Sequence, residues 1–361
     1  MNAFHPDNIA PRPVIPFTAD DMIPLHTRFT NAFNLDTPIA LAPMAMASGG
    51  ALAAACIHAG ALGLVGGGYG ELSWTQREYQ LALDSVALEQ RNRLGLGFIT
   101  WRLDEDASAL DWALNLPAEQ RPHGVMLSFG DPRPYARRIV QSGAKLLCQI
   151  QRFAQLDLAL DAGAHVIIAQ GAEAGGHGAN ALEGRSTFTL VPEIADHLAR
   201  QAPHTLLLAA GGVGDGRGLA AALSLGADGV LMGSRLWASR ESLAAPAAVA
   251  AALAAQGDDT ARSAVFDILR RKNWPAPYDF RALRNGLHRQ WESRIEELRR
   301  NPQAARADYE AGVAAGDFNR AHATVGEAIG LMTDAPGAQE LIVRTTHDAR
   351  ARLLHLSSRL A

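Results

Sequence analysis

Short apolar runs alternate with longer amphipathic segments through most of the first 240 residues. The eight runs read PIALAPM, LGLVGG, RLGLGFITW, GVMLSFG, KLLCQI, HVIIAQG, TLLLAAG and DGVLMGS. They are apolar at consecutive positions, which is typical of strands that are buried on both faces in a parallel sheet. Each segment between them is long enough for a crossover helix. The pattern therefore predicts eight parallel strands and seven intervening helices between Thr37 and Ser234.

Four of the connections between a predicted helix and the following strand share one sequence pattern. In each, glycine and alanine precede an apolar run, as in HAGALGLVGGG and DAGAHVIIAQG. Glycine commonly ends helices in the left-handed conformation, so we expect Gly60, Gly143, Gly163 and Gly226 to end helices just before strands. Eight such units in a chain of this length favour a (β/α)8 barrel. A doubly wound open sheet is the alternative.

The pattern changes on both sides of this region. Residues 1–36 are rich in proline and predict an N-terminal arm, and residues 37–240 would form the barrel core. Residues 241–361 contain long, charged, helix-like stretches such as RALRNGLHRQWESRIEELRRN, and predict a helical segment that packs on the barrel or closes it. KNWPAPYDF, with two prolines, is expected to be a loop between helices.

Composition and charge narrow the class of protein. The chain is 48% hydrophobic with a net charge of −4, and its basic residues are spread out, so no nucleic-acid or anionic-membrane surface is indicated. Cys56 and Cys148 lie far apart in apolar segments, which fits a reducing compartment. No apolar run approaches about 18 residues, and the amino terminus lacks the features of a signal peptide. We therefore expect a cytoplasmic protein that binds a small molecule, without a membrane or nucleic-acid partner.

In a (β/α)8 barrel the active site lies at the carboxyl ends of the strands. There the segments AAGGVGDGRG and LMGSR place Gly211, Gly212, Gly233 and Ser234 on the two loops that most often bind phosphate. Glycine-rich turns also arise for steric reasons alone. Because the chain has no GxGxxG match and no Gly-Lys pair, flavin mononucleotide (FMN) and phosphorylated sugars are the favoured ligands.

Other strand ends carry further candidates. Pro43 lacks an amide hydrogen, so Ala42-Pro43-Met44 either forms an irregular turn with backbone free for a ligand or simply ends the first strand. Polar side chains end three more strands, at Thr100, Gln149 and Gln170. They suit a ring with several heteroatoms, or they are polar residues satisfied inside the protein.

The segment AQGAEAGGHGAN follows the sixth strand and holds one histidine. Glu173 and His177 are four residues apart, but Gly175 and Gly176 disfavour the helix that a metal-binding pair would need. We expect no metal site and, since GxSxG is absent, no serine hydrolase. A lone loop histidine is more often a surface residue, yet this position makes His177 the candidate catalytic residue. A pKa near neutrality would let it take a proton or hydrogen-bond an anionic substrate.

The chain resembles the nitronate monooxygenase family, formerly called 2-nitropropane dioxygenases. The likeness is carried by APMA, AQGAEAGGHG, AAGGVGDGRGLAAALSLGADGVLMGSR and VFDILRRKNWPAPYDFRALRN, and it runs from about Thr37 to near the carboxyl terminus. It implies an FMN-dependent TIM barrel that oxidises alkyl nitronates, or neutral nitroalkanes, with O2. The products would be a carbonyl compound and nitrite, and neither a metal nor a nicotinamide would be needed.

The resemblance also implies roles for individual residues. Ala42-Pro43-Met44 would line the isoalloxazine, Gln170 would approach the ring or ribityl chain, and Gly175 and Gly176 would let the flavin approach the backbone. His177 would bind the nitronate oxygens or remove the α-proton of a nitroalkane. The full set of expected cofactor contacts is Ala42, Pro43, Met44, Thr100, Gln149, Gln170, Glu173, Gly175, Gly176, Gly211, Gly212, Gly233 and Ser234.

Three alternatives remain open. FMN-dependent enoyl-ACP reductases, which use NADH, share the EAGGH segment. Only the long helical tail favours a nitronate oxidase over such a reductase. A sugar-phosphate isomerase or lyase is disfavoured because no strand ends in lysine: the chain's two lysines are Lys145, which begins a strand, and Lys272. A flavin-binding protein without turnover is the third alternative.

Overall fold

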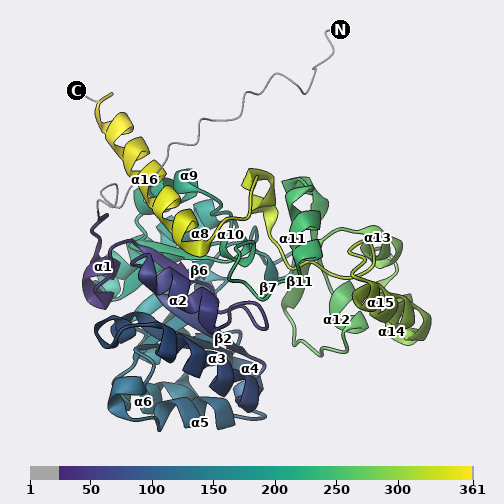
Figure 1. Cartoon of the computed structure of the whole chain (residues 1–361), viewed down its shortest axis with the longest axis horizontal. Coiled ribbons are helices and arrows are strands. Elements are labelled where there is room, and N and C mark those ends of the chain that lie inside the picture. The colour runs from purple at the N-terminus through teal and green to yellow at the C-terminus, as the bar shows by residue number, and fades with distance from the viewer. Residues whose placement is uncertain (1–23, 360–361) are drawn as a thin grey trace.

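The computed structural model describes residues 24–359, and its larger part is a barrel of parallel strands (Figure 1). The strands are β1 (Ile39–Leu41), β2 (Gly63–Gly68), β3 (Leu94–Ile99), β4 (Gly124–Ser128), β5 (Lys145–Ile150), β6 (Val166–Gln170), β8 (Leu206–Ala210) and β9 (Gly229–Met232). Their order is β1-β9-β8-β6-β5-β4-β3-β2, and a parallel bridge from Ala40 to Leu62 joins the two edges. The predicted (β/α)8 barrel is confirmed, and the open sheet is wrong.

Helices cover the outside of the barrel between successive strands. They are α2 (Gly50–His58), α3 (Leu72–Ser85), α4 (Thr100–Leu103) with α5 (Ser108–Leu114), α6 (Arg133–Gln141), α7 (Leu156–Asp161), α8 (Thr187–Gln201) and α9 (Gly216–Ser224). The glycines that were predicted to end helices have φ values of +79°, +92°, +76° and +94° at Gly60, Gly143, Gly163 and Gly226. These left-handed turns confirm the predicted joints between helices and strands.

The eighth helical position is filled from the far end of the chain. Helix α16 (Ala338–Ser357) packs against α9 and α2 (Figure 1). About a hundred residues therefore separate β9 from the helix that completes the barrel's outer layer. The expected division at residue 240 stays a prediction, but α16 lies on the barrel.

Apolar side chains fill the barrel, and a short helix closes its lower end. Helix α1 (Arg28–Phe33) contributes Phe29 and Phe33, both fully buried in the interior cluster with Leu64 and Ile168. Phe33 and Phe29 lie against the first residues of β4 and β9, which places α1 at the amino-terminal end of the strands. Residues 1–23 of the expected arm lie outside the described residues, and residues 28–33 are helical rather than an arm.

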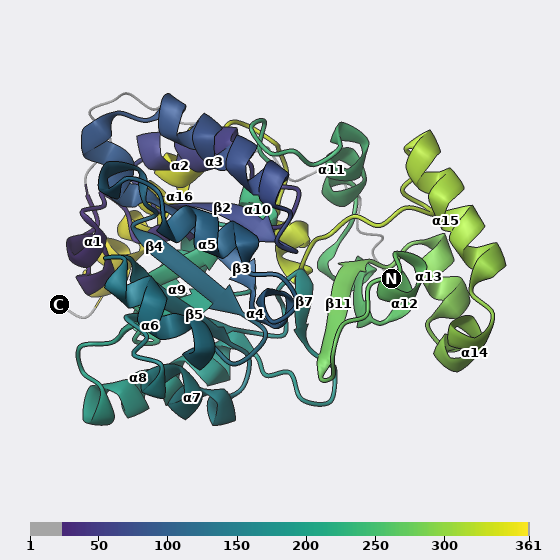
Figure 2. The ribbon, with the colours of Figure 1, turned by 90° about the horizontal axis from the view of Figure 1, so that it is seen from below.

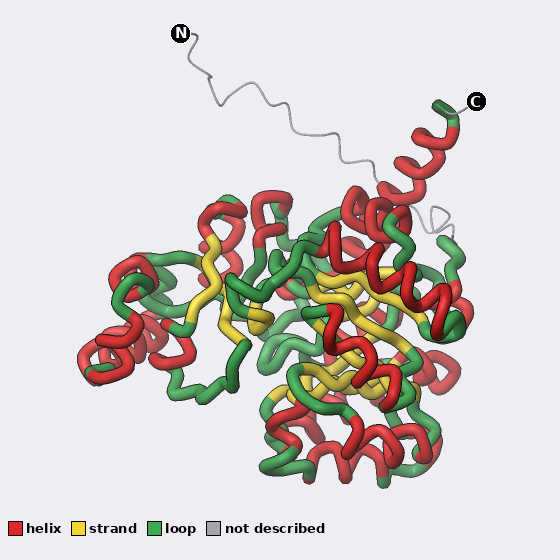
Figure 3. The backbone as a smooth tube through the Cα atoms, turned by 180° about the vertical axis from the view of Figure 1, so that it is seen from behind, coloured by secondary structure: helices red, strands yellow, loops and turns green. Residues whose placement is uncertain are grey.

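The segment after β9 is not purely helical, which corrects the prediction. Strands β10 (Thr260–Ser263) and β11 (Tyr278–Leu283) form an antiparallel sheet with β7 (Gly176–Ala179), seen apart from the barrel in Figures 2 and 3. The end of the expected loop and the start of the expected long helix are thus one strand. Pairing with β7 and β10 overrides the local helical pattern, because side-chain packing between strands decides such cases.

Most of the remaining helices of this segment form a lobe beside the barrel (Figure 2). The lobe contains α12 (Val265–Leu269), α13 (Gly286–Trp291), α14 (Ile295–Arg300) and α15 (Gln303–Ala315). The short α10 (Ser234–Trp237) lies at the barrel, where it contacts α16, and α11 (Pro246–Leu253) follows it along the chain. Val265, Phe266, Leu269 and Leu287 are buried in a separate apolar core there. No helix in the described range 24–359 is both long enough and apolar enough to cross a membrane.

Candidate active site

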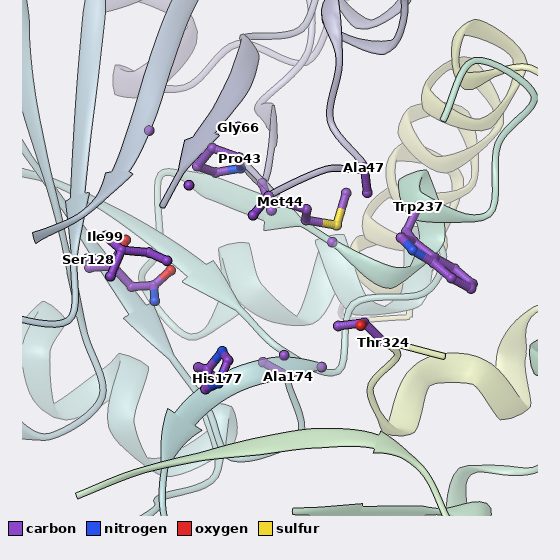
Figure 4. Close-up of a pocket in the computed structure, with 18 of the residues that line it drawn as sticks. Pro43, Met44, Ala47, Gly66, Ile99, Ser128, Ala174, His177, Trp237 and Thr324 are labelled. Carbon is purple, nitrogen blue, oxygen red and sulfur yellow. The ribbon is translucent and has the colours of Figure 1, made fainter. Parts of the chain in front are cut away.

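A cavity of about 560 Å³ lies at the carboxyl ends of the barrel strands, between the barrel and the following segment (Figure 4). This volume is within the range of about 300–1,000 Å³ that is usual for small-molecule and cofactor sites. Among the residues predicted from the sequence, the cavity is lined by Ala42, Pro43, Met44, Gln149, Gln170, Glu173, Gly175, Gly176, His177, Gly211, Gly212, Gly233 and Ser234. The structure thus brings together residues from five separate strand ends.

Thr100 is the exception among the predicted residues. It begins α4 and is buried, and its Oγ1 has no hydrogen-bond partner. A Cβ on Gly130 would lie 2.9 Å from the Cβ of Thr100, so the turn at Gly130 covers this side chain. Ile99 and Ser128 line the cavity on this side instead (Figure 4).

A buried arginine holds the glycine-rich loop after β6. The Arg262 guanidinium donates to the carbonyl oxygens of Ala174 at 2.7 Å and Gly176 at 3.0 Å, and to that of Asp279 at 2.7 Å. Burial, and secondarily the charge of Arg281, lower the pKa of Arg262 to about 9. Because the guanidinium still stays charged at neutral pH, the loop is fixed by charge-assisted hydrogen bonds.

The segment 324–327 crosses this loop from the other side. A Cβ on Gly175 would lie 2.4 Å from the carbonyl carbon of Val325, so the two backbones approach as closely as glycine allows. The amide of Gly326 donates to Ser234 Oγ at 2.9 Å. Ser234 therefore ties the end of β9 to this segment, and its hydroxyl hydrogen is still available to a ligand.

Glu173 lines the cavity, but its carboxylate is engaged elsewhere. Its oxygens accept from the Thr187 amide at 3.0 and 3.1 Å, from Thr187 Oγ1 at 3.0 Å and from Ser186 Oγ at 3.0 Å. These donors stand at the first turn of α8, where a carboxylate also interacts favourably with the helix dipole. In this structure Glu173 anchors α8 beneath the cavity wall.

Three glutamines fix the backbone of His177. Gln170 Nε2 donates to the carbonyl oxygen of His177 at 3.0 Å. Gln170 Oε1 accepts from Gln149 Nε2 at 3.0 Å and from Gln151 Nε2 at 2.9 Å. The amide of Gln170 is thereby oriented and its hydrogen bonds are largely made within the protein. Gln149 Oε1 remains the amide oxygen of this group that can face a ligand.

The imidazole of His177 is held on two sides. Its Nε2 lies 2.9 and 3.0 Å from the two carboxylate oxygens of Asp267, and its ring stacks on Trp274 with centroids 3.4 Å apart and an interplanar angle of 11°. Burial lowers the pKa of His177 to about 4, although the hydrogen bond and charge of Asp267 oppose this shift. The expected pKa near neutrality is wrong: the buried ring is a neutral imidazole at physiological pH.

Sequence reasoning missed the residues that the segment after β9 contributes to the cavity. They are Arg270, Lys272, Trp274, Phe280, His322, Thr324, Gly326 and Ala328. The sequence analysis considered only lysines at strand ends, but Lys272 reaches the cavity from the segment after β9. The stretch RRKNWPAP had a usable signal, since two prolines next to cationic and aromatic side chains are unusual in a plain connecting loop.

Comparisons with known proteins agree with this geometry. The sequence profile of the nitronate monooxygenase family matches residues 102–348. A nitronate monooxygenase of Neurospora crassa is 29% identical over 345 residues, which cover 86% of this chain and 89% of the relative. A nitronate monooxygenase of Metarhizium robertsii is 32% identical over 283 residues, covering 74% of this chain and 76% of the relative.

Two solved structures share the fold. FabK from Thermotoga maritima superposes with a TM-score of 0.76 at 26% identity, covering 93% of this chain and 99% of that one. A nitroalkane oxidase from Streptomyces ansochromogenes superposes with a TM-score of 0.70 at 22% identity, covering 90% and 99%. The profile match spans more than half of the chain. The chain therefore belongs to the nitronate monooxygenase family of oxidoreductases.

Proposed function

We propose that this protein is an FMN-dependent monooxygenase that oxidises alkyl nitronates, and neutral nitroalkanes, with O2 to a carbonyl compound and nitrite. The observation that carries the proposal is that one cavity joins a glycine-lined backbone wall to the buried pair of His177 and Asp267. The wall suits a flat phosphorylated ligand, and the histidine suits a small substrate that lies on it. The family membership and the relatives' printed activities support the same reaction.

The cavity fits FMN at its glycine wall. A Cβ on Gly233 would reach Ala42 and Met44 only at 3.8 Å, and one on Gly212 would reach Glu173 only at 3.7 Å, so both glycines face open cavity space. A side chain there would occupy the room that a cofactor needs. We assign Gly211, Gly212, Gly233 and Ser234 to the phosphate, because adjacent backbone amides and one hydroxyl can donate to it.

The flavin ring would lie between the strand ends and the turn that follows β1. Pro43 and Met44 project into the cavity opposite His177 and Ala174 (Figure 4). Gln149 offers an amide oxygen to a ring N–H. Bound FMN would take electrons from the substrate and pass them to O2. The protein's own groups orient the substrate, exclude water with Trp274 and Phe280, and move the proton at His177.

Two further expectations belong to this proposal. Cys56 and Cys148 are both free and buried, and burial raises the pKa of each thiol, that of Cys148 to about 12. Such thiols are unreactive and are compatible with a reducing cytoplasm, where we place the protein. We also expect the substrate and O2 to be its reaction partners, with no nucleic acid or membrane involved.

Anaerobic mixing tests the proposal directly. The purified protein should be yellow, with FMN released on denaturation. Propyl-2-nitronate mixed with it in the absence of O2 should bleach the flavin bands, and air should restore them with formation of acetone and nitrite. A protein that binds no added FMN would refute the cofactor. A yellow protein that is bleached by NADH and reduces enoyl thioesters, but ignores the nitronate, would instead be an enoyl reductase.

A further inference from the structure

We propose that Asp267 is a positioning residue that holds His177 in the Nε2–H tautomer, so that Nδ1 accepts the α-proton of a neutral carbon acid. This inference rests on the proposed function, because it concerns the substrate that the same cavity receives. It adds to that function the residue that keeps one nitrogen of His177 free to take the proton of a neutral nitroalkane. The residue that makes this possible comes from α12, 90 positions away in sequence.

The charge of Asp267 fixes the direction of the hydrogen bond between these residues, because Arg270 Nη2 lies 3.6 Å from Asp267 Oδ1 and favours the ionised carboxylate. The side chains of His177 and Asp267 are each only 7% exposed. An ionised carboxylate can only accept hydrogen bonds, so Nε2 must carry the hydrogen that lies between them. In a neutral imidazole the other nitrogen, Nδ1, then has a free lone pair. Nδ1 is the ring nitrogen left for the cavity that His177 lines.

Aromatic packing fixes the plane of the ring. Trp274 stacks on the imidazole, and Phe280, which stands opposite His177 in the β7–β11 ladder, contacts it with centroids 4.8 Å apart. Trp274 is itself held by a 3.0 Å hydrogen bond from its Nε1 to Tyr69 Oη. A flip of the imidazole would break the bond to Asp267 without offering Nδ1 a comparable partner. One orientation of the ring is thus selected.

The groups around the ring keep it neutral, which leaves the lone pair of Nδ1 unoccupied. Arg270, which follows α12, Arg262 on β10 and His322 in the segment before α16 lie near the ring, and burial together with the two arginines favours the neutral imidazole. Asp267 is the acidic group that opposes them. When the α-carbon's C–H bond breaks, its proton goes to Nδ1 and its electron pair stays on the substrate as the nitronate. Asp267 then supplies the counter-charge for the imidazolium that has formed.

The test compares two forms of one substrate on the FMN-loaded full chain. Neutral nitroethane needs a base, whereas ethyl nitronate has already lost the proton. Asp267→Asn should lower kcat/KM for nitroethane at least about 100-fold, since general-base catalysis contributes about 10²–10⁴-fold. For ethyl nitronate the change should be less than about fivefold. Asp308→Asn is the matched control, because it removes a partly exposed carboxylate of α15 that pairs with Arg320 on the surface of the lobe, and it should leave both values within about twofold.

A second readout does not depend on turnover. In ¹⁵N NMR of histidine-labelled wild-type protein at pH 7, with His177→Gln used to assign the signals, Nε2 of His177 should be protonated and Nδ1 unprotonated. A protonated Nδ1 would overturn the proposal. So would an equal loss with both substrates in an Asp267→Asn variant that keeps its FMN and its unfolding midpoint. If the wild type shows the predicted tautomer but oxidises neither compound, the proposed function fails and the role of Asp267 in holding the tautomer stands.

Discussion

Alanine at Gly175 and alanine at the neighbouring Gly176 should have different effects, because only Gly175 lies closely against another backbone segment. In Gly175→Ala the new Cβ would lie 2.4 Å from the Val325 carbonyl carbon and 2.6 Å from the Gly326 nitrogen, so the 324–327 segment must move by about 1 Å to reach ordinary contact. That movement stretches the hydrogen bond from Gly326 to Ser234 and the 3.0 Å bond from the Glu327 amide to the Glu173 carbonyl. Over-packing and the weakening of these two hydrogen bonds together should lower the free energy of unfolding by about 2–5 kcal/mol.

In Gly176→Ala the loss of stability has a different cause and should be smaller. Gly176 has a φ of +73°, but a Cβ there would meet only Thr324 Cγ2, at 3.7 Å. The left-handed conformation costs alanine about 1–2 kcal/mol, and no neighbour has to move. Gly175→Ala should therefore lose more unfolding free energy in chemical denaturation. It should also bind FMN at least about tenfold more weakly, because Ser234 loses its partner. Equal losses in the two variants, or none in Gly175→Ala, would refute the reasoning.

Three further outcomes follow from the site. His177→Ala should keep bound FMN, seen in its visible spectrum, and lose most oxidation of nitroethane; wild-type activity would exclude the assigned role. Because burial lowers the pKa of His177 to about 4, the protonated ring accumulates only near that pH. The nitroethane kcat/KM should thus stay flat from about pH 8 to 5.5 and fall below, and an acid limb near 6.5, the ordinary histidine value, would contradict this. Arg262→Met removes the donor to the Ala174 and Gly176 carbonyls and should cost about 2–4 kcal/mol in denaturant unfolding, against under about 1 kcal/mol for exposed Arg271→Met.

The barrel was predictable because its signals are local. A strand buried on both faces needs consecutive apolar residues, and a helix that ends just before such a strand favours glycine, so each βα unit carries its own pattern. Helix α1 was missed because it is only six residues long and its burial depends on the barrel that it closes. The glycine loops after β8 and β9 and Gln170 were placed at the cavity for the same local reason, since position after a strand fixes their place.

The other half of the site depends on contacts between distant segments. GHGA reads as a loop, and it becomes β7 only because β11 pairs with it, with Phe280 opposite His177. Nothing in the local sequence links Asp267 to a histidine 90 residues earlier. Thr100 shows the reverse error: a polar residue follows the strand, but the turn at Gly130 covers it. Position after a strand predicts which residues are near the cavity and does not predict which way each side chain points.

The division of the cavity between barrel and inserted segment has a chemical logic. The barrel side presents mainly backbone and apolar surface, from Pro43 and Met44 to the glycines after β8, which suits a flat cofactor that needs few specific side chains. The segment between β9 and α16 supplies Arg270, Lys272 and Trp274, which face the space beside His177. Both cationic residues are partly buried, and burial lowers the pKa of Lys272 from its ordinary value. The cofactor would therefore be recognised mainly by the barrel, while the charge and shape that would select a substrate lie in the insertion.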